Sequence, residues 1–94
     1  MDAILLEEII YTLSEHLNVS VDEITVDSLI TDDLRADSLD IVELVDIFET
    51  KYGITATDED IMGFSTVESV YDFIAEKLGV KANGSVIDER QITW

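Results

Sequence analysis

Hydrophobic residues near the start of the chain recur at every third or fourth position, which is the period of one face of an α-helix. They are Ile4, Leu5, Leu6, Ile9, Ile10, Leu13 and Leu17. This spacing predicts a helix over residues 2–17 with one buried stripe. Asp2 is expected to cap the helix, because an aspartate carboxylate accepts hydrogen bonds from the free amides of a helix start.

The segment from Asn18 to Ala36 breaks this period and scatters apolar residues among Asp, Ser and Thr. The apolar positions are Val19, Val21, Ile24, Val26, Leu29, Ile30 and Leu34. We predict a long loop that these side chains anchor to the core. Loops of this length are uncommon in small domains and often serve a function.

A second helix is predicted over residues 38–52, between Asp37 as its N-cap and Gly53 as the left-handed residue past its end. Its buried stripe is expected to consist of Ile41, Leu44, Val45, Phe48 and Tyr52. The opposite face carries Leu39, Val42, Glu43, Asp46, Glu49 and Thr50. We therefore expect an acidic outward face with two exposed aliphatic side chains.

Two further helices are predicted in the second half of the chain. The shorter, over residues 57–62, opens on acidic side chains that suit the positive end of a helix dipole. The longer follows Ser65, which is expected to cap it while Glu68 reaches back, and it ends at Gly79.

These elements predict an all-α fold. It is a small four-helix bundle of three longer helices and one short helix, with a long loop between the first and second helices. Residues 1–79 are the expected domain. Residues 80–94 are expected to be a C-terminal extension, and the sequence leaves open whether it docks as an added element or frays.

Composition supports one folded domain and excludes several partners. The chain has 94 residues, of which 47% are hydrophobic, enough for one small core. Its 22 acidic and 5 basic residues give a formal net charge of -17, which repels nucleic-acid phosphates and anionic membranes. No stretch approaches the ~20 apolar residues of a membrane span. We expect a cytoplasmic monomer that binds no nucleic acid, does not insert into membranes and attracts basic protein surfaces.

The sequence shows none of the usual arrangements of catalytic side chains. The chain contains no cysteine, its one histidine is His16, and its glycines are isolated rather than gathered in a phosphate-binding loop. Acidic pairs such as Asp32 and Asp33 lack the ligand spacing of a calcium loop. We expect no catalytic residues and no dedicated metal site, with His16 a lone surface histidine.

One further candidate for chemistry is Ser38, which lies at the junction of the long loop and the second predicted helix. A hydroxyl there would place an attached phosphate at a helix N-terminus, where the dipole and free amides favour an anion. From the residues alone, however, a helix cap made by Asp37 or Ser38 is the simpler interpretation.

The stretch Arg35-Ala36-Asp37-Ser38-Leu39-Asp40 resembles the hallmark of the acyl carrier protein family, which opens the second helix of a four-helix bundle. The resemblance continues through Val42-Glu43-Leu44-Val45, through Asp58-Glu59 and Thr66-Val67, and reaches Leu78. It covers about four-fifths of the chain.

This resemblance implies that a phosphopantetheinyl transferase attaches 4'-phosphopantetheine from coenzyme A to Ser38, with Asp37, Leu39 and Asp40 flanking the cofactor. The thiol of the arm would then carry acyl groups as thioesters, and the chain would be a non-catalytic carrier. Acyl chains would shelter against Leu44, Val45, Phe48, Ile61 and Ile74. Acyl-loading and acyl-processing enzymes with basic patches would dock on Leu39, Val42, Glu43, Asp46 and Glu49.

Three departures from the family pattern shape this interpretation. Arg35 replaces a common glycine and brings a positive charge beside the phosphate site, Asp46 replaces an often apolar residue, and residues 80–94 extend past the usual end. They favour a specialised lipid, polyketide or lipopolysaccharide pathway as much as fatty-acid synthesis. Two alternatives stay open: an aminoacyl or peptidyl carrier, and an unmodified acidic interaction module.

Overall fold

The computed structural model describes residues 1–79, so the predicted extension over residues 80–94 lies outside the described part of the chain. The elements in order are α1 (Ala3–Leu17), the 3-10 helix η1 (Val21–Glu23), α2 (Ser38–Tyr52), α3 (Asp58–Met62) and α4 (Val67–Leu78). Within residues 1–79 there is no strand, only one isolated bridge between Leu29 and Thr66. The predicted all-α, four-helix architecture is confirmed, while η1 was not expected.

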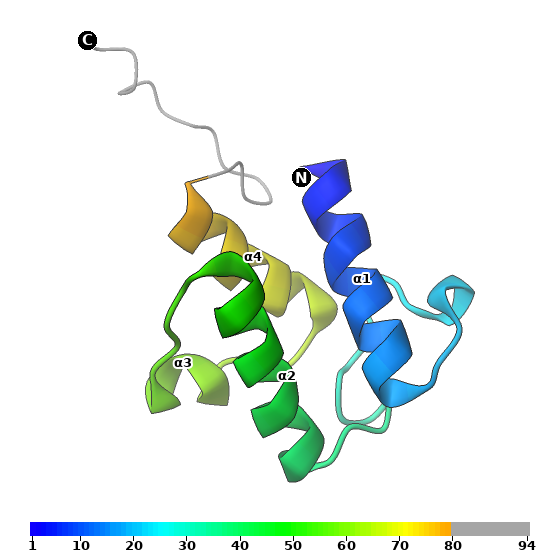
Figure 1. Cartoon of the computed structure of the whole chain (residues 1–94). Coiled ribbons are helices and arrows are strands. Elements are labelled where there is room, and N and C mark those ends of the chain that lie inside the picture. The colour runs from blue at the N-terminus through cyan, green and yellow to red at the C-terminus, as the bar shows by residue number, and fades with distance from the viewer. Residues whose placement is uncertain (80–94) are drawn as a thin grey trace, which may run out of the picture.

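The three longer helices pack lengthwise around a shared core (Figure 1). α1 descends from the N-terminus, and α2 and α4 run back in the opposite direction. The short α3 lies beside α2 in the connection to α4. As a result, the last turn of α1 and the first turn of α2 meet at the same end of the bundle.

Helix ends follow the sequence closely, with one exception. The Asp2 carboxylate accepts hydrogen bonds from the amides of Ile4 and Leu5, and Gly53 ends α2 with a left-handed φ of 67°. Both caps were predicted. α4 instead starts one residue later than predicted.

The cap of α4 is Thr66, and its partner in the capping box is Ser69 rather than Glu68. The prediction of Ser65 as the cap is therefore wrong. The reason is a tertiary contact: the carbonyl of Ser65 accepts a hydrogen bond from the amide of Ile30 at 2.9 Å. This pairing keeps the chain extended through Thr66.

The core is built from α1, α2, α4 and the long loop. Tyr71 and Ile9 are fully buried near its centre, and the loop adds Ile24, Ile30 and Leu34. The prediction that apolar side chains anchor this loop holds for these three, whereas Val21 and Leu29, which were also expected to anchor it, are 45% and 38% exposed. Ile4, by contrast, was placed in the buried stripe of α1 and is 71% exposed, because it lies on the edge of that stripe in the first turn.

The long loop is also fastened through its backbone. The amide of Val67 donates to the carbonyl of Ser28 at 3.1 Å, and the amide of Glu68 donates to the carbonyl of Val26 at 2.9 Å. Amides in the first turn of a helix have no partner within the helix itself. The loop supplies those partners, so it is tied to the start of α4.

Arg35 adopts a left-handed backbone conformation, with a φ of 64°. Its neighbours Leu34 and Ala36 are both buried. The chain must turn sharply between two anchored side chains, and a left-handed residue makes that turn. Residues with a Cβ pay roughly 1–2 kcal/mol for this conformation, whereas glycine adopts it freely.

We predict that Arg35→Gly raises the free energy of unfolding by about 1 kcal/mol relative to Arg35→Ala. Both variants remove the charge, so their difference isolates the backbone conformation. Urea denaturation followed by circular dichroism measures it. Equal stability of the two variants would contradict a strained Arg35.

Candidate functional site

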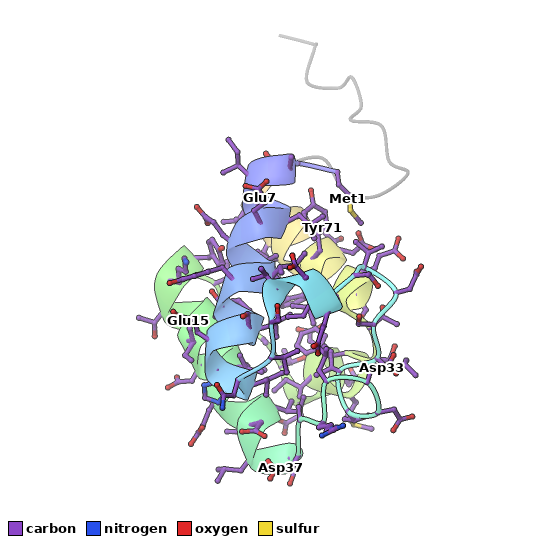
Figure 2. All side chains as sticks on the ribbon, turned by 90° about the vertical axis from the view of Figure 1, so that its right-hand side faces the viewer. Met1, Glu7, Glu15, Asp33, Asp37 and Tyr71 are labelled. Atoms are coloured by element: carbon purple, nitrogen blue, oxygen red, sulfur yellow. The ribbon has the colours of Figure 1, made fainter. Side chains whose placement is uncertain are left out.

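Ser38 is the first residue of α2, and its side chain is exposed. Figure 2 shows the preceding residue, Asp37, at the opposite end of the molecule from Met1 and Glu7. Within residues 1–79, the Ser38 hydroxyl makes no hydrogen bond. The hydroxyl is therefore accessible to solvent.

The capping of α2 is done by the neighbours of Ser38. The Asp37 carboxylate accepts from the Asp40 amide at 2.9 Å, and the Asp40 carboxylate accepts from the Asp37 amide at 3.1 Å. This reciprocal capping box satisfies free amides at the helix start. Of the two residues considered as caps, Asp37 has that role and Ser38 does not.

Two opposing features determine the electrostatics around Ser38 at the N-terminal end of α2. The positive end of the α2 dipole favours an anionic group on Ser38. The carboxylates of Asp37 and Asp40 add negative charge on either side, and Arg35 is the only cationic residue between residues 32 and 50. A phosphate on Ser38 would therefore gain from the helix and remain surrounded by acidic side chains.

The outward face of α2 largely matches the prediction. Leu39 and Val42 are 64% and 60% exposed, and Glu43 and Asp46 are also exposed. We call these four residues the α2 face. It combines a small apolar centre with carboxylates.

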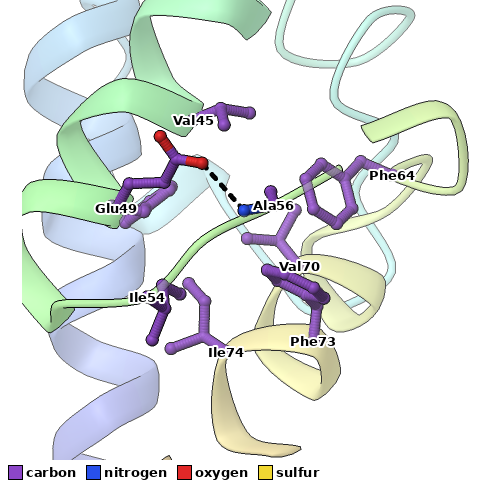
Figure 3. A pocket seen from close by; sticks show the side chains of 9 residues that line it. Val45, Glu49, Ile54, Ala56, Phe64, Val70, Phe73 and Ile74 are labelled. Atoms are coloured by element: carbon purple, nitrogen blue, oxygen red, sulfur yellow. Dashed lines mark hydrogen bonds between the residues drawn. The ribbon is translucent and has the colours of Figure 1, made fainter. Parts of the chain in front are cut away.

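Glu49 differs from the rest of the predicted docking residues. It is half-buried, and its carboxylate accepts a hydrogen bond from the Ala56 amide at 2.8 Å. Its carboxylate thus fastens the segment that follows α2 and also borders an apolar pocket (Figure 3). A helical projection could not reveal this contact, because Ala56 lies beyond the helix end.

Two small adjoining apolar pockets lie between α2 and α4. Their volumes are about 10 and 20 Å³, room for roughly one water molecule each. Of the predicted acyl-chain residues, Val45 and Phe48 line both pockets, while Leu44 and Ile74 line one each. Ile61 lines neither.

Sequence reasoning missed several residues that line these pockets, namely Ile54, Phe64, Val70 and Phe73. Phe64 and Phe73 pack edge to face, with ring centroids 5.3 Å apart. Figure 3 shows their rings on the α4 side of the pocket, across from Val45. Phe64 lies in the connection between α3 and α4, where no periodic pattern marks a residue as buried.

α3 begins beside these pockets with its own capping box, between Thr57 and Asp60. The Thr57 amide donates to the Asp60 carboxylate at 2.9 Å, and this bond holds the pKa of Asp60 below its usual value. The predicted helix over residues 57–62 is confirmed, with Thr57 as its cap.

His16 is not isolated, contrary to the prediction. Its Nε2 atom lies 3.1 Å from a carboxylate oxygen of Glu43 and 3.6 Å from one of Asp40. The contact joins the last turn of α1 to the first two turns of α2. Sequence alone could not pair residues that are this far apart along the chain.

No helix among the described residues is long and apolar enough to cross a membrane.

Comparison with known proteins gives consistent matches. A family model described as "Phosphopantetheine attachment site" matches residues 7–74. An acyl carrier protein of Petrotoga mobilis is 40% identical over 76 residues, which are 81% of this chain and 89% of that protein. An acyl carrier protein of Clostridium perfringens is 48% identical over 64 residues, which are 68% of this chain and 84% of that protein.

A solved structure gives the same match at the level of the fold. The acyl carrier protein from Enterococcus faecalis superposes with a TM-score of 0.70 at 31% sequence identity. The match covers 80% of this chain and 95% of the other.

Proposed function

This chain belongs to the acyl carrier protein family, and we propose that Ser38 is the residue that bears its 4'-phosphopantetheine. The protein is a non-catalytic carrier: the covalently attached arm supplies a thiol that holds acyl groups as thioesters. The observation that carries the assignment is an exposed serine with a free hydroxyl at the start of a helix capped by its neighbours.

The attachment step follows from the position of Ser38. Its Oγ would attack the phosphorus of coenzyme A that bears the pantetheine, and a phosphodiester would form. The pyrophosphate bond would break with adenosine bisphosphate as the leaving group, and the hydroxyl proton would pass to a base on the transferase. Because Asp37 and Asp40 cap α2 through each other, no hydrogen bond of the helix start is lost when Ser38 reacts.

Membership of the family implies contacts with a phosphopantetheinyl transferase and with acyl-processing enzymes. We propose that these enzymes dock on the α2 face through basic patches. Leu39 and Val42 would form the apolar centre of the contact, and Glu43 and Asp46 would steer the encounter. Glu49 has its carboxylate bound to the Ala56 amide and is a lesser candidate for that role.

The apolar pockets are candidates for the acyl chain. At about 10 and 20 Å³ they are too small for a chain of several carbons, so the surrounding side chains must move apart to admit one. We propose that the chain enters beside Val45 and displaces the rings of Phe64 and Phe73. The half-buried positions of all three support this, since side chains at a pocket's edge have room to move.

We propose that residues 1–79 are the carrier domain of a cytoplasmic monomer. Its pathway would be fatty-acid synthesis or a specialised lipid, polyketide or lipopolysaccharide route. The acidic Asp46 on the α2 face supports a partner whose patch is more basic than apolar.

The assignment of Ser38 predicts that Ser38→Ala abolishes modification. The unmutated protein and Ser65→Ala, which changes another exposed serine, should each gain one phosphopantetheine. Intact mass is measured after incubation with coenzyme A, Mg²⁺ and a broad-specificity transferase. The free energy of unfolding of Ser38→Ala should change by less than about 0.5 kcal/mol, because Ser38 is exposed and is not the cap.

Modification of Ser38→Ala would show that the site is elsewhere. An unmutated chain that stays folded and unmodified, while a known carrier is modified in parallel, would favour the acidic interaction module.

The docking proposal predicts that Glu43→Lys with Asp46→Lys lowers kcat/KM for the transferase at least tenfold at low ionic strength. The difference should shrink as salt screens the charges. The control is Glu7→Lys with Glu76→Lys, which makes the same charge change at exposed positions in α1 and in the last turn of α4, outside the α2 face, and should alter the rate by less than about threefold. If both double variants slowed the transferase reaction equally, the effect would come from net charge and not from docking on the α2 face.

The acyl-chain proposal predicts that an octanoyl group raises the melting temperature of the unmutated carrier and of Val42→Phe. In Val45→Phe the rise should fall by at least half, because the added ring fills the small pockets. Val42 is an exposed valine on the same helix and provides the matched control. Each variant is compared with its own unacylated form by thermal denaturation, so any cost of overpacking cancels. Equal rises in all three proteins would place the acyl chain elsewhere.

A further inference from the structure

The contact between α1 and the start of α2 gathers three metal-ligating side chains. His16 comes from the last turn of α1, and Asp40 and Glu43 come from the first two turns of α2. One ligand atom of each, a ring nitrogen and two carboxylate oxygens, lies within 4.8 Å of the others. A histidine facing two carboxylates from another helix is more than an acidic patch, because it adds a ligand that prefers transition metals.

The spacing of these atoms fits a zinc ion. Zinc bonds to nitrogen and oxygen are about 2.0–2.1 Å long, so two ligands at a tetrahedral angle lie roughly 3.3 Å apart. Nε2 of His16 lies 3.1 Å from Glu43 and 3.6 Å from Asp40, close to that value on either side. The two carboxylate oxygens lie within 4.8 Å of each other, so the carboxylates would have to draw closer to surround an ion.

Part of the site is held in place before any ion binds. One carboxylate oxygen of Asp40, Oδ2, accepts a hydrogen bond from the Asp37 amide, while the other, Oδ1, faces His16. Such a hydrogen bond to a ligand fixes its orientation. Glu43, whose side chain is 51% exposed, is the most exposed of the three and has room to turn toward the ion.

The donor set also selects among cations. Calcium and magnesium prefer oxygen ligands throughout, whereas one imidazole with two carboxylates suits zinc and similar transition metals. The two carboxylates balance the double positive charge of the ion. The partial exposure of all three side chains leaves room for water as a fourth ligand.

We propose that His16, Asp40 and Glu43 form a zinc-type metal site that clamps the end of α1 to the start of α2. The site goes beyond the proposed carrier function, since it needs neither the arm nor an acyl group. A bound ion would place positive charge two residues from Ser38 and would neutralise part of the α2 face. Metal occupancy would thereby alter the surface that partner enzymes meet.

The test is a calorimetric titration of the unmodified full chain with Zn²⁺. Millimolar Mg²⁺ is present throughout, so that weak acidic sites are already occupied. We expect one Zn²⁺ per chain and a higher melting temperature in its presence. His16 is the only histidine in the sequence, so its imidazole NMR signals report directly on the site and should shift at the same stoichiometry.

His16→Gln and Glu43→Gln should each weaken Zn²⁺ binding at least tenfold. Asp46→Asn is the matched control, because it removes one carboxylate charge from the same helix outside the cluster, and it should change the affinity less than twofold. Unchanged affinity in His16→Gln, or His16 signals that do not respond to Zn²⁺, would overturn the proposal and leave only a polar contact between His16 and the two carboxylates. Because the protein is unmodified, neither result depends on the role of Ser38.

Discussion

The start of α2 depends on the hydrogen bonds that tie the long loop to the first turn of α4. The amides of Val67 and Glu68 have no partners within their own helix, and the loop carbonyls of Ser28 and Val26 accept their hydrogen bonds. The same loop buries Ile30 and Leu34 in the core, so backbone and side chains hold it together. A loop fastened in this way delivers Ser38 to a defined place at the end of the bundle. An exposed residue can thus be accurately positioned without contacts of its own.

This constraint also explains the strain at Arg35. Leu34 and Ala36 are both anchored, and the turn between them requires a left-handed residue. A glycine would make that turn at no steric cost. Arginine instead is the only Lys or Arg between residues 32 and 50, in a chain with a formal net charge of -17. Here a small loss of stability accompanies a local change in the electric field around the proposed attachment site.

The core has little spare volume, which has consequences for a carrier. The pockets between α2 and α4 hold about 10 and 20 Å³, so a sheltered acyl chain must create most of its own space. The rings of Phe64 and Phe73 and the side chain of Val45 are half-buried at this boundary and can move more readily than the fully buried Tyr71 and Ile9. The packing is thus tightest around Tyr71 and Ile9, and the half-buried side chains lie where, as proposed, cargo would enter.

The sequence by itself determined the helices, most of their caps and the exposed serine at the start of α2. These features depend on near neighbours: Asp2 and Asp37 bond to amides within three residues, and the buried stripes follow the helical period. Only the tertiary structure decided that Thr66 rather than Ser65 caps α4, that Glu49 turns to Ala56, and that His16 meets Asp40 and Glu43. Each of these depends on a contact between segments that no local pattern relates, because their approach is set by how the loop and helices pack.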